Sequence, residues 1–92
     1  MQPRKIVAAD DERDMRDFYQ KMLPALGHEV LFVAGSGDEL IAACENRTPD
    51  LIITDIRMPG MDGIDAANHL WMRYHVPVLL VSAYHDLSLI HI

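Results

Sequence analysis

Residues 51–63 read Leu51-Ile52-Ile53-Thr54-Asp55-Ile56-Arg57-Met58-Pro59-Gly60-Met61-Asp62-Gly63. The four apolar or β-branched residues at its start predict a strand that is buried on both faces, as in a parallel sheet. Asp55 stands where this strand should end, and a turn rich in Pro and Gly follows. Because the carboxyl ends of parallel strands form the ligand crevice of an open α/β sheet, Asp55 is a candidate for chemistry. This segment alone leaves open the alternative that Asp55 only caps the turn.

Three further apolar runs predict strands at residues 6–9, 30–33 and 76–81, with Pro77 at the first positions of the last one. Apolar residues at helical spacing alternate with these strands. The alternation predicts an α/β fold: a doubly wound parallel sheet with right-handed crossovers and helices on both faces.

Local signals suggest where the helices begin and end. Asp11 can cap the first helix, Gly27 can stop it, and Pro24 can end or kink it early. Ser36 with Glu39 three residues later has the form of a capping box, which opens the second helix. The residues expected to face the core are Leu40, Ile41, Ala43 and Cys44 in the second helix and Ile64, Ala67, Leu70 and Trp71 in the third.

Length and composition narrow the class of protein. The chain has 92 residues, which allows one small domain, and its formal net charge is −6. This acidity argues against non-specific binding to nucleic acid and fits a site that gathers cations. A lone cysteine, and the lack of a signal peptide or an apolar run of transmembrane length, predict a cytoplasmic protein without a membrane partner.

Polar groups follow three of the predicted strands: Asp10 and Asp11 after the first, Asp55 after the third and Ser82 after the fourth. With the strand order 2-1-3-4, these strands are neighbours and their ends share one edge of the sheet. Three carboxylates so close together repel one another and need a cation, and Mg²⁺ prefers such oxygen ligands. A carboxylate there can form an aspartyl phosphate, to which Ser82 can donate a hydrogen bond. Taken singly, Asp11 could be only a helix cap and Ser82 only a turn residue.

Three blocks of sequence carry a resemblance to a known family: Ile6-Val7-Ala8-Ala9-Asp10-Asp11-Glu12, residues 49–63, and Val76-Pro77-Val78-Leu79-Leu80-Val81-Ser82-Ala83. In order and spacing they resemble the receiver domain of bacterial two-component response regulators, over about residues 4–86. The resemblance implies the flavodoxin-like fold.

The resemblance also implies roles for individual residues. Asp55 would be the phosphoacceptor, and Mg²⁺ would be held by Asp10, Asp11, Asp55 and the backbone carbonyl of Arg57. Ser82 would be the switch hydroxyl, while Arg57 and Tyr84 would modulate the lifetime of the phosphoryl group.

The implied partners are a histidine kinase or phosphotransfer protein, docked on the first helix around residues 15–22, and an output domain or protein downstream, outside this chain. The implied activity is phosphorelay signal transduction, and we do not expect an enzyme beyond chemistry on the chain itself.

The end of the chain departs from the family, whose receivers continue through a fourth helix, a fifth strand and a fifth helix that include a lysine paired with the phosphoryl group. We expect residues 4–86 to be a truncated receiver domain and residues 87–92 a non-native tail. Leu-Ser-Leu-Ile-His-Ile is what CTG TCT CTT ATA CAC ATC encodes, a string that resembles a transposon end used as a sequencing adapter. The alternative is the start of a genuine short amphipathic helix. Without the lysine, phosphorylation should be weak or absent.

Two other functions remain possible at this stage. An aspartate-nucleophile phosphohydrolase of the haloacid-dehalogenase type needs Asp-x-Asp after the first strand, whereas this chain has Asp10-Asp11-Glu12. A receiver-like interaction module that is never phosphorylated would not need the intact acids and Ser82.

Overall fold

The structure is a computed structural model that describes residues 2–82 and the strand at residues 87–90. Its elements are β1 (Lys5–Ala9), α1 (Arg13–Ala25), β2 (Glu29–Ala34), α2 (Gly37–Asn46), β3 (Leu51–Asp55), α3 (Gly63–Tyr74), β4 (Val78–Val81) and β5 (Leu87–Ile90).

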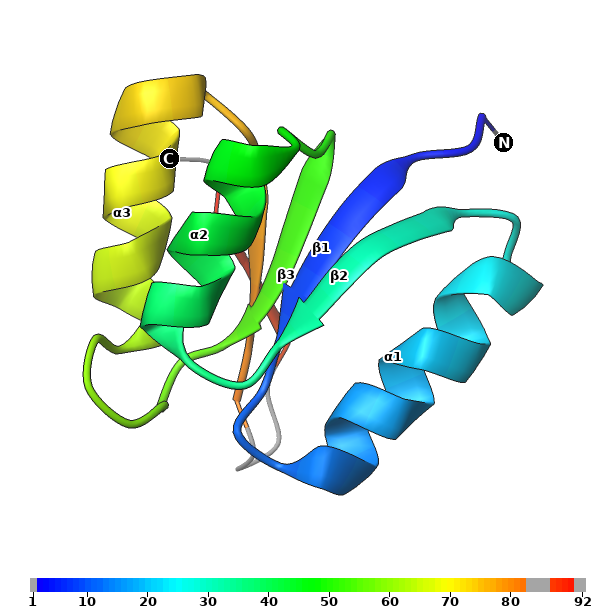
Figure 1. Ribbon diagram of the computed structural model, residues 1–92, viewed down its shortest axis with the longest axis horizontal. Coiled ribbons are helices and arrows are strands. Elements are labelled where there is room, and N and C mark those ends of the chain that lie inside the picture. Colours follow the sequence, from blue (N-terminus) through cyan, green and yellow to red (C-terminus); the bar gives the residue numbers. More distant parts are fainter. Residues whose placement is uncertain (1, 83–86, 91–92) are drawn as a thin grey trace.

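The strands form one sheet in the order β2-β1-β3-β4-β5, of which the first four are parallel (Figure 1). This confirms the predicted order 2-1-3-4. Ala9 pairs with Thr54, and Asp55 pairs with Val81. The carboxyl ends of β1, β3 and β4 therefore lie together at one edge of the sheet.

The fifth strand was not predicted. β5 runs antiparallel to β4, with Val78 opposite Ile90 and Val81 opposite Leu87. The alternative of a helix start does not describe residues 87–90, which form a strand. The physical reason is the edge of the sheet: β4 would otherwise present a row of unpaired backbone groups, and a short connection allows an antiparallel strand to pair with them. That residues 87–92 are non-native stays a prediction.

Helices cover both faces of the sheet, as predicted, with α1 on one face and α2 and α3 on the other (Figure 1). Side chains of β1 alternate between the two layers because successive residues of a strand point to opposite faces. The α1 layer contains Ile6, Ala8, Tyr19, Leu23 and Ile53. The opposite layer includes Val7, Ala9, Leu40, Cys44, Ile52, Leu70, Val78 and Leu80.

The predicted capping residue of α1 is wrong, although the helix begins at Arg13. The N-cap residue is Glu12, whose side chain makes no capping hydrogen bond, so Asp11 does not cap the helix. Instead the carboxylate of Asp10 accepts a hydrogen bond from the Glu12 N–H at 2.9 Å. At the other end, α1 runs one residue past Pro24, and Gly27 follows in the left-handed region at φ 91°, as expected of a helix stop.

The capping box of α2 is confirmed, since the Ser36 hydroxyl accepts a hydrogen bond from the Glu39 N–H at 3.2 Å. In α3 the buried stripe differs from the predicted one by part of a turn. Ala66, Ala67 and Leu70 are buried, whereas Ile64 is 44% exposed. Trp71 is half-buried and stacks on His75 with ring centres 5.1 Å apart.

The start of the fourth strand also differs slightly. β4 begins at Val78, so Pro77 precedes the strand, where its carbonyl accepts a hydrogen bond from the Ile52 N–H at 3.0 Å. Across the described residues, the helices are too short or too polar for any of them to span a membrane.

Candidate functional site

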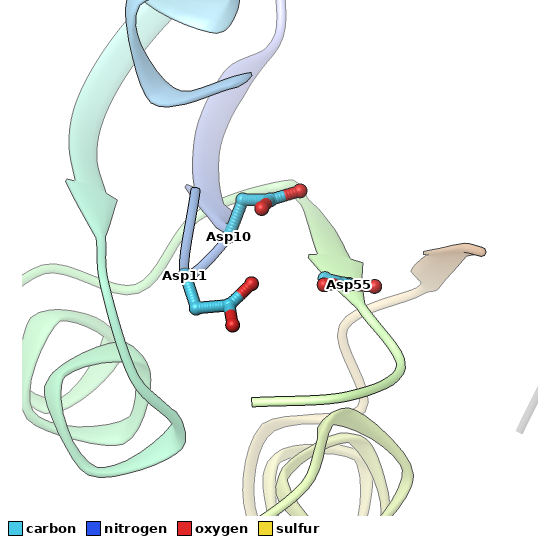
Figure 2. A group of neighbouring side chains, drawn as sticks. All are labelled: Asp10, Asp11 and Asp55. Carbon is cyan, nitrogen blue, oxygen red and sulfur yellow. The ribbon is translucent and has the colours of Figure 1, made fainter. Parts of the chain in front are cut away.

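Three aspartates meet at the carboxyl edge of the sheet. Asp10 and Asp11 follow β1, and Asp55 is the last residue of β3 (Figure 2). One carboxylate oxygen from each lies within 4.8 Å of the others. Asp10 and Asp55 are only 5% and 7% exposed, whereas Asp11 is open to solvent. The predicted juxtaposition of the three acids is confirmed.

Backbone and side-chain hydrogen bonds fix the position of Asp10. Its N–H donates to the carbonyl of Ala34 at 3.0 Å, which extends the pairing of β1 with β2 by one residue. Its own carbonyl accepts from the Arg16 guanidinium at 3.0 Å. Together with the bond from Glu12 to its carboxylate, these contacts set both the main chain and the side chain of Asp10.

Asp55 is held by the turn that follows it. Main-chain N–H groups of Ile56 and Arg57 donate to its carboxylate. The chain then returns through Pro59 and Gly60, whose φ of 75° lies in the left-handed region that glycine adopts without steric cost.

Gly63 closes this turn against the strand end, because its N–H donates to the Ile56 carbonyl at 2.7 Å. A Cβ at position 63 would overlap the main-chain carbonyl oxygen of Asp55. Glycine is therefore required here for a close approach of two backbones, which lets α3 start directly beside the acidic site.

Burial and the charges of neighbouring acids make Asp10 and Asp55 costly to ionise. Burial is the main cause that raises the pKa of Asp10, and the charges of Asp55 and Asp11 raise it further. The pKa of Asp55 is raised first by burial and then by the charge of Asp11, against the lowering effect of the two main-chain N–H groups. Burial and the charges of Asp10 and Asp55 raise the pKa of Tyr19 to about 12, so its hydroxyl stays protonated. A cation among these oxygens would offset the repulsion.

We expect Asp55→Asn to stabilise the metal-free chain at neutral pH. A carboxyl group whose folded pKa is raised contributes stability below its unfolded pKa and loses it as pH rises through the folded pKa. Removing the charge should gain on the order of 1 kcal/mol, or about 4–8 °C in Tm, at pH 7. The gain should shrink as the pH falls through the raised folded pKa of Asp55, because the carboxyl then becomes protonated in the folded chain. Thermal unfolding followed by circular dichroism in EDTA tests this, and a gain that does not change with pH would contradict it.

A cavity of about 320 Å³ opens beside the acids, lined by Asp10, Glu12, Met15, Asp55, Val81 and Ser82. Ser82 thus lies at the same cavity as Asp10 and Asp55, as predicted. Glu12 and Met15 were not predicted, because their place on the wall depends on how α1 leaves the sheet. No lysine is among the lining residues that the structure describes.

Two further residues were predicted to act at the site, Arg57 and Tyr84. Arg57 is exposed and lies two residues beyond Asp55. Tyr84 is outside the described residues.

The site and the fold agree with the comparisons to known proteins. The family model of the response regulator receiver domain matches residues 6–91. The chain therefore belongs to the response regulator receiver domain family, a family of signalling domains of two-component systems.

Among its relatives, the transcriptional regulatory protein PdtaR of Mycobacterium tuberculosis is 35% identical over 88 residues, which are 96% of this chain and 43% of PdtaR. A protein-glutamate methylesterase/protein-glutamine glutaminase of Natronomonas pharaonis is 36% identical, over 87% of this chain and 22% of its own. The chain thus spans less than half the length of these two relatives.

Solved structures give the same result. The response regulator PhyR from Brucella abortus superposes with a TM-score of 0.84 at 30% identity, covering 90% of this chain and 35% of PhyR. The receiver domain of the response regulator NarL from Mycobacterium tuberculosis gives a TM-score of 0.82 at 29% identity, covering 94% of this chain and 71% of the other.

Proposed function

We propose that this chain is a phosphoacceptor module that takes a phosphoryl group onto Asp55 in a Mg²⁺-dependent reaction. The observation that carries the proposal is the group of three carboxylates within 4.8 Å, two of them buried, beside an open cavity. Family membership supports the same chemistry.

Asp10, Asp11 and Asp55 would hold the metal, together with the main-chain carbonyl of Arg57. The donor set fits, because Mg²⁺ prefers oxygen ligands and is held in proteins by one or two carboxylates and water. When bound, it would neutralise charge that develops on the transferred phosphoryl group.

Asp55 is the member of the group suited to act as nucleophile. A carboxylate oxygen of Asp55 attacks the phosphorus, and the bond to the donor breaks with its electron pair leaving on the donor, a histidine nitrogen or an acyl oxygen. The main-chain N–H groups of Ile56 and Arg57 orient the carboxylate. Ser82, at the same cavity, would donate a hydrogen bond to the phosphoryl oxygens and act as the switch hydroxyl.

The proposed donor is a histidine kinase or a phosphotransfer protein that docks on α1. The proposed recipient of the signal is an output domain or protein that this chain does not include. We propose no catalytic turnover beyond the phosphorylation and dephosphorylation of the chain itself.

Mg²⁺ removal tests the proposal directly. The 92-residue chain is incubated with acetyl phosphate and Mg²⁺, and intact mass spectrometry counts the phosphoryl groups. We expect slow addition of one hydroxylamine-labile group per chain, and none in EDTA. The rate should be low because the described cavity wall contributes no lysine. A chain that binds no Mg²⁺ and acquires no label would instead favour the interaction module without phosphorylation. Labelling that EDTA does not change would also contradict the proposal.

A further inference from the structure

The guanidinium of Arg16 contacts the end of β1 from the first turns of α1. It donates a hydrogen bond to the main-chain carbonyl of Asp10 at 3.0 Å, not to a carboxylate. Arg16 is half-buried, and no role in the site was predicted for it from the sequence. The contact ties the helix to the residue that starts the acidic group.

The same guanidinium also lies beside the loop that joins β2 to α2. A Cβ placed on Gly35 would be 3.5 Å from Arg16 Nη1 and 3.4 Å from Glu39 Oε1. The Glu39 carboxylate accepts a hydrogen bond from the Gly35 N–H at 2.7 Å, while the Glu39 N–H is bound by Ser36. The guanidinium of Arg16 therefore lies between the carbonyl of Asp10 and the loop at Gly35 that precedes α2.

Two strands are held in register at this point. The Asp10 N–H donates to Ala34, the last residue of β2, and the Asp10 carbonyl accepts from Arg16. The peptide groups on both sides of Asp10 are thus fixed, one by the sheet and one by the helix. Rotation of this main chain would carry the carboxylates of Asp10 and Asp11 away from Asp55.

We propose that Arg16 is a positioning residue for the metal site, which it supports by fixing the main chain of Asp10. The inference rests on the proposed function, because it assumes that the three acids bind Mg²⁺. Outer partners of metal ligands orient those ligands, and their loss commonly weakens metal binding about 10–100-fold. Arg16 donates to the main-chain carbonyl of Asp10 and not to its side chain. It can therefore orient Asp10 while the Asp10 carboxylate remains available to a cation.

The test compares Mg²⁺ affinity among variants of the whole chain by isothermal titration calorimetry with MgCl₂. Arg16→Ala should weaken binding by about tenfold or more. Arg13→Ala is the matched control, because Arg13 is exposed on the same helix and its loss changes the net charge equally. It should leave the affinity within about twofold of the original chain. Arg16→Lys keeps a donor for the Asp10 carbonyl and should recover most of the affinity.

Thermal unfolding in EDTA separates positioning from folding. R16A should remain folded without metal, with a Tm close to that of R13A. A chain with R16A that is unfolded in EDTA would show that Arg16 serves the fold itself, and equal Mg²⁺ affinities for R16A and R13A would overturn the proposal too. A failure of the original chain to bind Mg²⁺ would instead contradict the proposed function.

Discussion

Asp55→Asn is expected to reduce phosphorylation by acetyl phosphate and Mg²⁺ to below detection. The amide oxygen of Asn is a poor nucleophile, and the product would not be an acyl phosphate. The replacement is nearly isosteric, and its oxygen can still accept the hydrogen bonds that Ile56 and Arg57 donate. Because the same change should stabilise the metal-free fold, a loss of labelling cannot be attributed to unfolding. Intact mass spectrometry measures the label, and circular dichroism confirms the fold.

Asp17→Asn is the matched control, since Asp17 is an exposed acid on α1 whose loss changes the charge equally. Its labelling should equal that of the original chain. The phosphohydrolase alternative makes the opposite prediction, because its nucleophile would lie after β1. Phosphatase turnover that Asp10→Asn abolishes and Asp55→Asn leaves intact would support that enzyme class. Labelling that persists in Asp55→Asn would place the acceptor on another residue.

The strand order and the acidic site could be predicted from sequence because both depend on short, local patterns. Buried strands of a parallel sheet are continuous apolar runs, and the residue at which each run stops is readable directly. Parallel pairing then brings Asp10, Asp55 and Ser82 to one edge, whatever the details of the packing. The structure places all three at one cavity.

Contacts between elements could not be predicted in the same way. Nothing in the sequence around Arg16 shows that its guanidinium reaches the carbonyl of Asp10. The assignment of Asp11 as a helix cap was wrong for a related reason. Cap preference is a local property, and here Glu12 takes the N-cap position and donates its N–H to the Asp10 carboxylate, while Asp11 faces Asp55.

The fifth strand shows the same limit at the edge of the sheet. The pattern at residues 87–90 is short enough to fit either a helix start or a strand, and its pairing with β4 decides between them. The prediction that Ile64 faces the core was a smaller error. The predicted and observed buried stripes of α3 share Ala67 and Leu70. In the first turn, however, the buried residues are Gly63 and Ala66. A side chain at position 63 would overlap the main-chain carbonyl of Asp55. Only glycine therefore allows the first turn of α3 to lie in this orientation.

Leu70→Ala is expected to lower the stability of the fold strongly. Leu70 is fully buried in the layer that α2 and α3 form over the sheet. Truncation removes apolar contacts and leaves a cavity, which typically costs about 2–5 kcal/mol. That is a large part of the roughly 5–15 kcal/mol that holds a domain folded, so the Tm should fall by about 10 °C or more.

Met72→Ala gives the matched control for this change. Met72 is a large apolar residue on the same helix, two positions later, and is 76% exposed. Its truncation should change the stability by no more than about 0.5 kcal/mol. Urea unfolding followed by circular dichroism compares the two variants. Equal losses would mean that α3 does not pack as described. Since α3 starts against Asp55 at Gly63, such a result would also remove the support that the helix gives to the acidic site.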